Sequence, residues 1–171
     1  MSMTALAIMG MAMFQAGGDP SSQASASPAC EAAKALIEAS VTDIEVGALV
    51  DSPAPPFRGL WKNASELKAG GWTGQPPTAE LLDEWQAAAG ENVLACPSIR
   101  TAQAHSKGAS VSRGETHLVG LPTLDHTGYE AIAQVSITKP SPELGGSVHL
   151  YLLQKFKTGW VVVSRRMIAI S

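Results

Sequence analysis

Charged and aromatic residues are scarce in this chain, and this composition argues against nucleic acid as a partner. Of the 171 residues, 16% are charged and 5% are aromatic, and the formal net charge at pH 7 is −3. Arg165-Arg166 is the only adjacent pair of basic residues, so the sequence has no basic stripe with which to neutralise phosphates. We therefore expect no nucleic acid as a partner. The 45% share of apolar residues is typical of an ordinary globular domain.

Motifs of catalysis, nucleotide binding and metal binding are missing as well. The sequence contains no G-x-S-x-G, G-x-x-x-x-G-K-[ST] or G-x-G-x-x-G pattern. No two histidines form an H-x-H or H-x-x-x-H pair, the spacing with which two histidines ligate one metal ion. The sequence therefore assigns no catalytic residue, and we expect neither a metal nor a cofactor.

Cysteine is nearly absent, and its two occurrences, Cys30 and Cys96, are informative for that reason. In an exported chain an isolated pair of cysteines is most simply a disulfide. Such a bond would close a loop of about 66 residues, for which chain entropy gives roughly 4 kcal/mol of stability. The alternatives are two buried thiols or a nucleophilic Cys96, which would need a histidine close in space.

The first residues indicate an export signal. Residues 1–18 carry no charge, and residues 5–14 form an apolar run that is too short to span a bilayer but suits the core of a signal peptide. The usual positive charge before that core is missing, and a buried N-terminal helix is the alternative interpretation. A Gly/Ser/Ala-rich tether follows. We expect residues 1–26 to be signal peptide and tether, cleaved after Ala16, Gly18 or Ala26, and residues 27–171 to form a single domain, periplasmic or secreted, without a transmembrane span.

Hydrophobic periodicity predicts two helices followed by a sheet. Helices are expected over residues 27–40 and 78–90, each with a residue suited to cap its start (Ser27 and Thr78). Strands are expected over residues 115–121, 129–138, 147–156 and 160–170, because apolar and polar side chains alternate there. With no room for helices between them, the strands predict an antiparallel meander. The fold class is therefore α+β: N-terminal helices packed on one face of a curved sheet of four or slightly more strands.

The turns and loops complete this scheme. A Gly159-containing loop of three or four residues closes the last hairpin, and Trp160 is expected to pack near Leu152 or Phe156 across it. Residues 57–77 hold two tryptophans without a clear period and are expected to fold back onto the core. Residues 103–114 are polar and predict an exposed loop.

One face of the sheet supplies a candidate pocket. His149 and Tyr151 share a face of one strand, and His117 could join them from another. These side chains line a pocket if their face is concave, and they are solvated if it is the outer face. Asp125 beside His126 resembles an acid–base pair, but an Asp that opens a type I turn is explained by turn chemistry alone.

Two stretches carry a resemblance to known proteins. The pattern Leu-Ala-Cys-Pro-Ser-Ile-Arg at residues 94–100, together with the ending Gly-Trp-Val-Val-Val-Ser-Arg-Arg-Met-Ile-Ala-Ile-Ser, resembles a group of uncharacterised exported bacterial proteins that end in a G-x-W-V-V-type strand. The sheet half also resembles nuclear transport factor 2-like and cystatin-like folds. These resemblances imply helices on a curved sheet, and they imply no activity.

Two hypotheses about function follow. The first is an exported, non-enzymatic binding or envelope-associated domain, whose partner is an unknown small molecule or protein. The alternative is a small hydrolase or isomerase that works in a pocket with His117, His149 or Asp125 as acid–base groups. Convergence of these side chains would favour the enzyme.

Overall fold

A computed structural model describes residues 27–40, 44–57, 63–106, 114–140 and 145–170. Within them the chain forms four α-helices, two short 3-10 helices and one sheet of five strands, so the predicted α+β class is confirmed. The helices are α1 (Pro28–Ala39), η2 (Val46–Ala48), α2 (Ala64–Lys68), α3 (Ala79–Ala87), η3 (Val93–Ala95) and α4 (Pro97–Ser106), and the strands are β1 (Thr116–Val119), β2 (Thr123–Leu124), β3 (Glu130–Thr138), β4 (Gly146–Phe156) and β5 (Gly159–Ile170).

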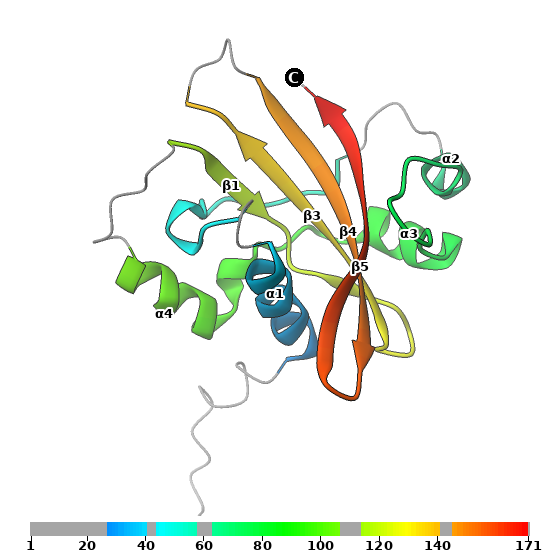
Figure 1. Ribbon diagram of the computed structural model, residues 1–171, viewed down its shortest axis with the longest axis horizontal. Helices are drawn as coiled ribbons and strands as arrows, with labels where there is room; N and C mark the ends of the chain where they lie inside the picture. The colour runs from blue at the N-terminus through cyan, green and yellow to red at the C-terminus, as the bar shows by residue number, and fades with distance from the viewer. Residues whose placement is uncertain (1–26, 41–43, 58–62, 107–113, 141–144, 171) are drawn as a thin grey trace, which may run out of the picture.

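The sheet is the predicted antiparallel meander with one short extra strand. Its order is β1-β3-β4-β5, and β2 also pairs with β3. Val119 of β1 pairs with Val135, and Thr123 of β2 pairs with Ile132, so β1 and β2 follow the same edge of β3 one after the other. Residues 120–122 interrupt this edge, and the sheet stays open (Figure 1).

Both faces of the sheet are covered. The disulfide face, which carries Ala133, Val135 and Tyr151, packs against α1 and the two cysteines. The α3 face, which carries Ile132 and Leu152, packs against α2 and α3. In Figure 1, α1 and α4 accordingly lie to the left of β5 and α2 and α3 to its right. The cause is that β3 and β4 are apolar on both parities at their centres, a pattern typical of strands buried on two sides.

The two predicted helices are present, with different ends. Pro28 opens α1, but the side chain of Ser27 makes no capping hydrogen bond. Thr78 caps α3 as expected, because its hydroxyl oxygen accepts a hydrogen bond from the backbone N–H of Leu81 (3.2 Å). The helix α3 ends at Ala87, three residues before the glycine that was expected to end it.

Two further helices were not predicted. Part of the stretch expected as an irregular tryptophan loop forms α2, whose first turn is capped by the side chain of Asn63. Residues 103–106, expected as loop, belong to α4; residues 107–113 of the same expected loop lie outside the described residues. Only Ile99 and Gln103 of α4 are buried. Its sequence therefore lacks the regular spacing of apolar residues from which a helix is predicted.

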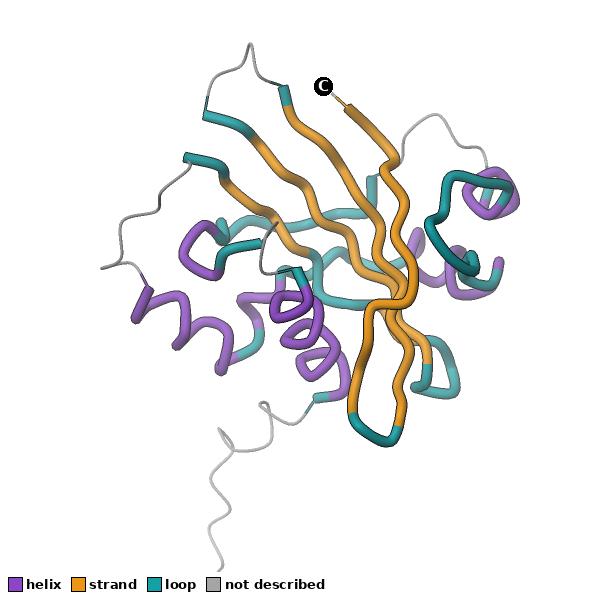
Figure 2. The backbone as a smooth tube through the Cα atoms, in the orientation of Figure 1, coloured by secondary structure: helices purple, strands orange, loops and turns teal. Residues whose placement is uncertain are grey.

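The hairpin between β4 and β5 is tighter than predicted. Phe156 pairs with Gly159, so the loop proper contains two residues instead of three or four. Gly159 has φ 119°, a conformation that residues with a Cβ rarely adopt, so the tight turn depends on a glycine at this position. The hairpin projects at the lower edge of the molecule, beside the turn that joins β2 to β3 (Figure 2).

This register changes the neighbours of Trp160. The tryptophan lies opposite Lys155, whose ammonium nitrogen is 5.7 Å from the centroid of its ring. Leu152 and Phe156, the neighbours expected from the sequence, have the opposite parity to Lys155 and therefore point to the other face of the sheet. The difference follows from the loop, because a change of one residue in its length exchanges the faces.

Cys30 and Cys96 lie at disulfide-bonding distance, as the sequence predicted. Their sulfur atoms are 2.07 Å apart and their Cα atoms 5.6 Å apart. The pair connects α1 to the residue that directly precedes α4, so it fixes both helices against the disulfide face of the sheet.

The expected signal peptide, residues 1–26, lies outside the described residues. Among those that are described, no helix combines the length and the apolar character needed to cross a bilayer.

Candidate functional site

The three residues expected to line a pocket lie on one face of the sheet. His117 pairs with Ile137, and His149 pairs with Val135, so both histidines share the disulfide face with Tyr151. Residues directly opposite one another in a sheet project to the same side. The alternation of apolar and polar residues along the strands was sufficient to assign these three side chains to one face.

The structure brings His149 and Tyr151 together in a hollow that we call the β4–β5 pocket. Its volume is about 370 Å³. Its lining consists of Gly71, Thr73, Ile137, His149, Tyr151, Arg165 and Met167. His117 is not part of this lining: it is buried on β1, with β3 between it and His149, and two strand spacings correspond to about 10 Å.

The segment from Gly71 to Gly74, which we call the β5 strap, supplies one wall of the pocket. The backbone N–H of Thr73 donates to the carbonyl of Arg165 (2.9 Å), and the N–H of Arg165 donates to the Thr73 hydroxyl (3.0 Å). The next N–H, of Gly74, donates to the hydroxyl of Ser164 (3.0 Å). The strap therefore runs along the outer edge of β5 and carries the Thr73 side chain to the pocket.

The polar groups of the pocket are held by neighbours on the same strands. The Nε2 atom of His149 lies 2.9 Å from the hydroxyl oxygen of Ser147, two residues earlier on β4. The rings of His149 and Tyr151 are tilted by 42° with their centroids 6.4 Å apart. Only 3% of Tyr151 is exposed, so its ring has a fixed position in the core.

Arg165 gives the pocket its charge. The residue is exposed, and the described residues that line the pocket include no aspartate or glutamate. The neighbouring Arg166 projects to the opposite face, where its guanidinium donates to the carbonyl oxygen of Leu67; burial lowers its pKa. Of the two adjacent arginines noted in the sequence, only Arg165 therefore faces the pocket.

Asp125 lies at the far end of the sheet from the pocket. Its backbone N–H donates to the carbonyl of Glu130, at the start of β3. His149 pairs five residues further along β3, which corresponds to about 17 Å. The structure therefore does not bring Asp125 together with His117 or His149.

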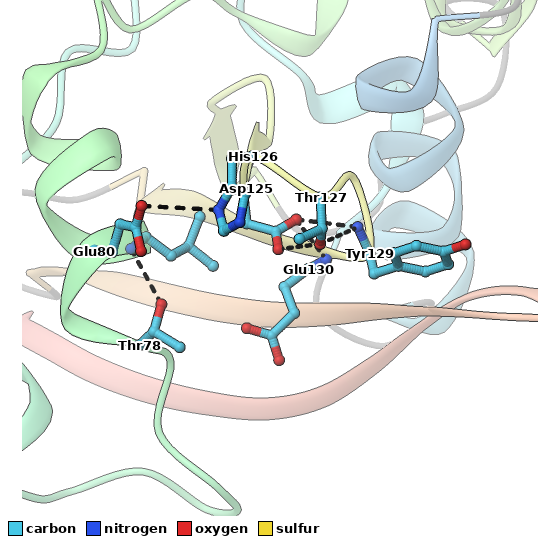
Figure 3. A network of polar contacts seen from close by, with 8 residues as sticks. Thr78, Glu80, Asp125, His126, Thr127, Tyr129 and Glu130 are labelled. Carbon is cyan, nitrogen blue, oxygen red and sulfur yellow. Dashed lines mark hydrogen bonds and ion pairs between the residues drawn. The ribbon is translucent and has the colours of Figure 1, made fainter.

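The carboxylate of Asp125 organises a turn (Figure 3). It accepts hydrogen bonds from the N–H groups of Tyr129 and Glu130, both 3.0 Å, and from the hydroxyl of Thr127. Burial raises the pKa of this carboxyl, but these donors outweigh burial and hold the pKa below its ordinary value. An aspartate with this many donors is kept ionised, which is the role expected of a turn residue.

His126 is directed away from Asp125. Its Nδ1 atom lies 3.7 Å from a carboxylate oxygen of Glu80, with both side chains 68% exposed (Figure 3). This pair links the β2–β3 turn to the first turn of α3. Exposed pairs of this kind contribute little to stability, typically about 0–1 kcal/mol.

Sequence reasoning missed Thr73 and Arg165 as members of the site. Thr73 lies in a stretch without periodicity, 92 residues before its partner on β5, and nothing local indicates that contact. The parity of β5 could have indicated Arg165, but the irregularity in pairing between Leu152 and Leu153 shifts the register, and such bulges are invisible to an alternation rule.

Known proteins offer no template for this site. No family model, no curated protein and no solved structure matches the chain.

Proposed function

We propose that this protein is an exported, non-enzymatic binding domain that holds a small organic anion in the β4–β5 pocket. The observation that carries the proposal is the composition of the lining, which combines the cation of Arg165 with the polar side chains of Thr73, His149 and Tyr151 and, within the part of the chain that the structure describes, has no carboxylate. Arginine is well suited to carboxylate or phosphate groups, because its planar guanidinium donates several hydrogen bonds at once.

The rest of the lining indicates what else the ligand carries. Ile137 and Met167 are apolar and flank the polar groups, so they match an alkyl or aryl portion of the anion. A volume of about 370 Å³ lies at the lower end of the range of small-molecule sites, about 300–1,000 Å³. A carboxylate or phosphate ester with a short apolar chain satisfies both requirements.

Binding is favoured over catalysis by the separation of the titratable side chains. General acid–base chemistry needs groups within about 3 Å of the reacting atom. His117, His149 and Asp125 come from different parts of the sheet, and Asp125 is committed to its turn. The hydrolase or isomerase alternative has no comparable observation in its favour.

Export is supported by two independent features. One is the uncharged apolar run at residues 5–14 with the tether that follows it. The other is the pair of cysteines at bonding distance, since structural disulfides persist in oxidising compartments.

The export part is tested by intact mass spectrometry of the protein recovered from its native host. We expect a chain that begins after Ala16, Gly18 or Ala26, because cleavage removes the apolar run. A product that still begins at Met1 or Ser2 would contradict export.

The binding part is tested by calorimetric titration with hexanoate, hexyl phosphate and the neutral analogue hexanol. The anions should bind and the alcohol should not. Arg165→Gln should weaken anion binding by about 10-fold or more, because a hydrogen bond to a charged group contributes about 1.5–3 kcal/mol. The matched control is Lys157→Gln, which removes an exposed cation from the hairpin loop and should leave affinity unchanged. Equal binding of hexanol, or an unaffected Arg165→Gln, would refute the assignment of an anion site.

A further inference from the structure

A second pocket lies on the α3 face of the sheet, on the opposite side from the β4–β5 pocket. We call it the α3-end pocket; its volume is about 240 Å³. It is formed by the end of α3, the segment before residue 57 and the interruption between β1 and β2. Its lining includes Pro56, Trp85, Glu91, Leu121, Pro122 and Gln134.

The walls of this pocket are fixed before any ligand arrives. The Gln134 side chain is buried and accepts a hydrogen bond from the N–H of Phe57 (2.6 Å), while its amide nitrogen donates to the carbonyl of Pro55 (3.3 Å). The N–H of Leu121 donates to the carbonyl of Glu91 (2.6 Å), which holds the backbone of Glu91 at the edge of the pocket. A site with a fixed shape loses little entropy when a ligand binds.

The charge of this pocket is opposite to that of the β4–β5 pocket. Among the described residues of its lining, Glu91 is the one that is ionisable, and it is exposed. In the described part of the chain its carboxylate has no hydrogen bond or ion pair. The helix α3 also directs its carboxyl end here, with no basic residue in its last turn, and that end of a helix carries partial negative charge. Both contributions attract a cation.

The apolar part of the lining selects the kind of cation. Trp85, Pro56, Leu121 and Pro122 line the same pocket as Glu91. A hard metal ion needs several oxygen ligands, and the described residues contain no group of three His, Cys, Asp or Glu side chains able to hold one. Organic ammonium ions, by contrast, bind well where an aromatic ring and one negative charge lie together. We propose that the α3-end pocket is a second binding site, specific for a small organic ammonium ion.

The test is a titration with tetramethylammonium chloride, followed by calorimetry at constant ionic strength, with sodium chloride and calcium chloride titrated separately. Tetramethylammonium should bind at one site, and neither metal salt should produce the same signal. Glu91→Gln should weaken that binding by about 10-fold or more. Because Glu91 is exposed, its loss should leave the melting temperature without ligand unchanged, which separates lost binding from lost folding.

Two control variants make the result specific. Glu45→Gln makes the same substitution at an exposed position outside the pocket and should bind tetramethylammonium as the wild type does. Arg165→Gln, which alters the β4–β5 pocket, should also leave it unchanged, so this inference and the proposed anion site can fail separately. Absence of a tetramethylammonium signal beyond that of sodium chloride, tighter binding of calcium, or full binding by Glu91→Gln would each overturn the proposal.

Discussion

Replacing Trp160 by alanine is expected to lower the free energy of unfolding by about 3–5 kcal/mol. Trp160 is 8% exposed and belongs to the core beneath α1, together with Leu36, Tyr151 and Leu153. Truncation leaves a cavity in this core as well as removing apolar area from it. Because folded domains are stable by only about 5–15 kcal/mol, the variant should unfold at a clearly lower urea concentration.

Two further variants separate packing from other effects. Lys157→Ala lies in the exposed hairpin loop and should change the free energy by less than about 0.5 kcal/mol. Trp160→Phe keeps an aromatic ring and removes the indole N–H, which is buried without a hydrogen-bond partner among the described residues, so it should cost clearly less than Trp160→Ala. If the alanine variant is as stable as Lys157→Ala in urea titration, the packing under α1 is wrong.

Removing the cysteine pair should have an effect of similar size. The double variant Cys30→Ala with Cys96→Ala is expected to lose about 2–5 kcal/mol, because an unfolded chain without the crosslink regains the freedom of a loop of 66 residues. Denaturing the wild type with iodoacetamide and no reductant should label neither cysteine. Uptake of two labels would show that the thiols are unbonded.

Reductant provides the control for this second prediction. Dithiothreitol should shift the urea midpoint of the wild type toward that of the double variant and should leave the double variant unchanged. A shift of both proteins would point to an effect unrelated to the Cys30–Cys96 pair.

The strands could be predicted because each carries its own signal. Alternation over about ten residues fixed the position of β3, β4 and β5 to within one residue at either end, since it reflects burial of a strand's face. The sequence of β4 also indicated that both faces of the sheet are covered. Leu150, Leu152 and Leu153 are apolar, lie on both parities of the strand and are all buried.

The helix α4 and the pocket residue Thr73 could not be predicted, because both depend on contacts between segments that are distant in the sequence. The helix α4 is defined by its packing beside η2, and Ile99 is its one large apolar residue. Thr73 reaches the pocket through its two hydrogen bonds with the backbone of Arg165, which no local pattern encodes. His149 and Tyr151 could be assigned from parity because they lie on one strand, whereas contacts made across the chain require the fold.

The β5 strap has a consequence for the behaviour of the protein at high concentration. β5 is an edge strand of twelve residues with three exposed apolar side chains, Val161, Met167 and Ile170, and long edges of this kind invite pairing with another chain and aggregation. The strap occupies the middle of the edge, where a Cβ on Gly74 would come within 2.7 Å of the carbonyl oxygen of Val163. A neighbouring molecule therefore meets two short stretches of edge instead of one long one, and a bulkier residue at position 74 would push the strap away and open a continuous surface for fibre-like association.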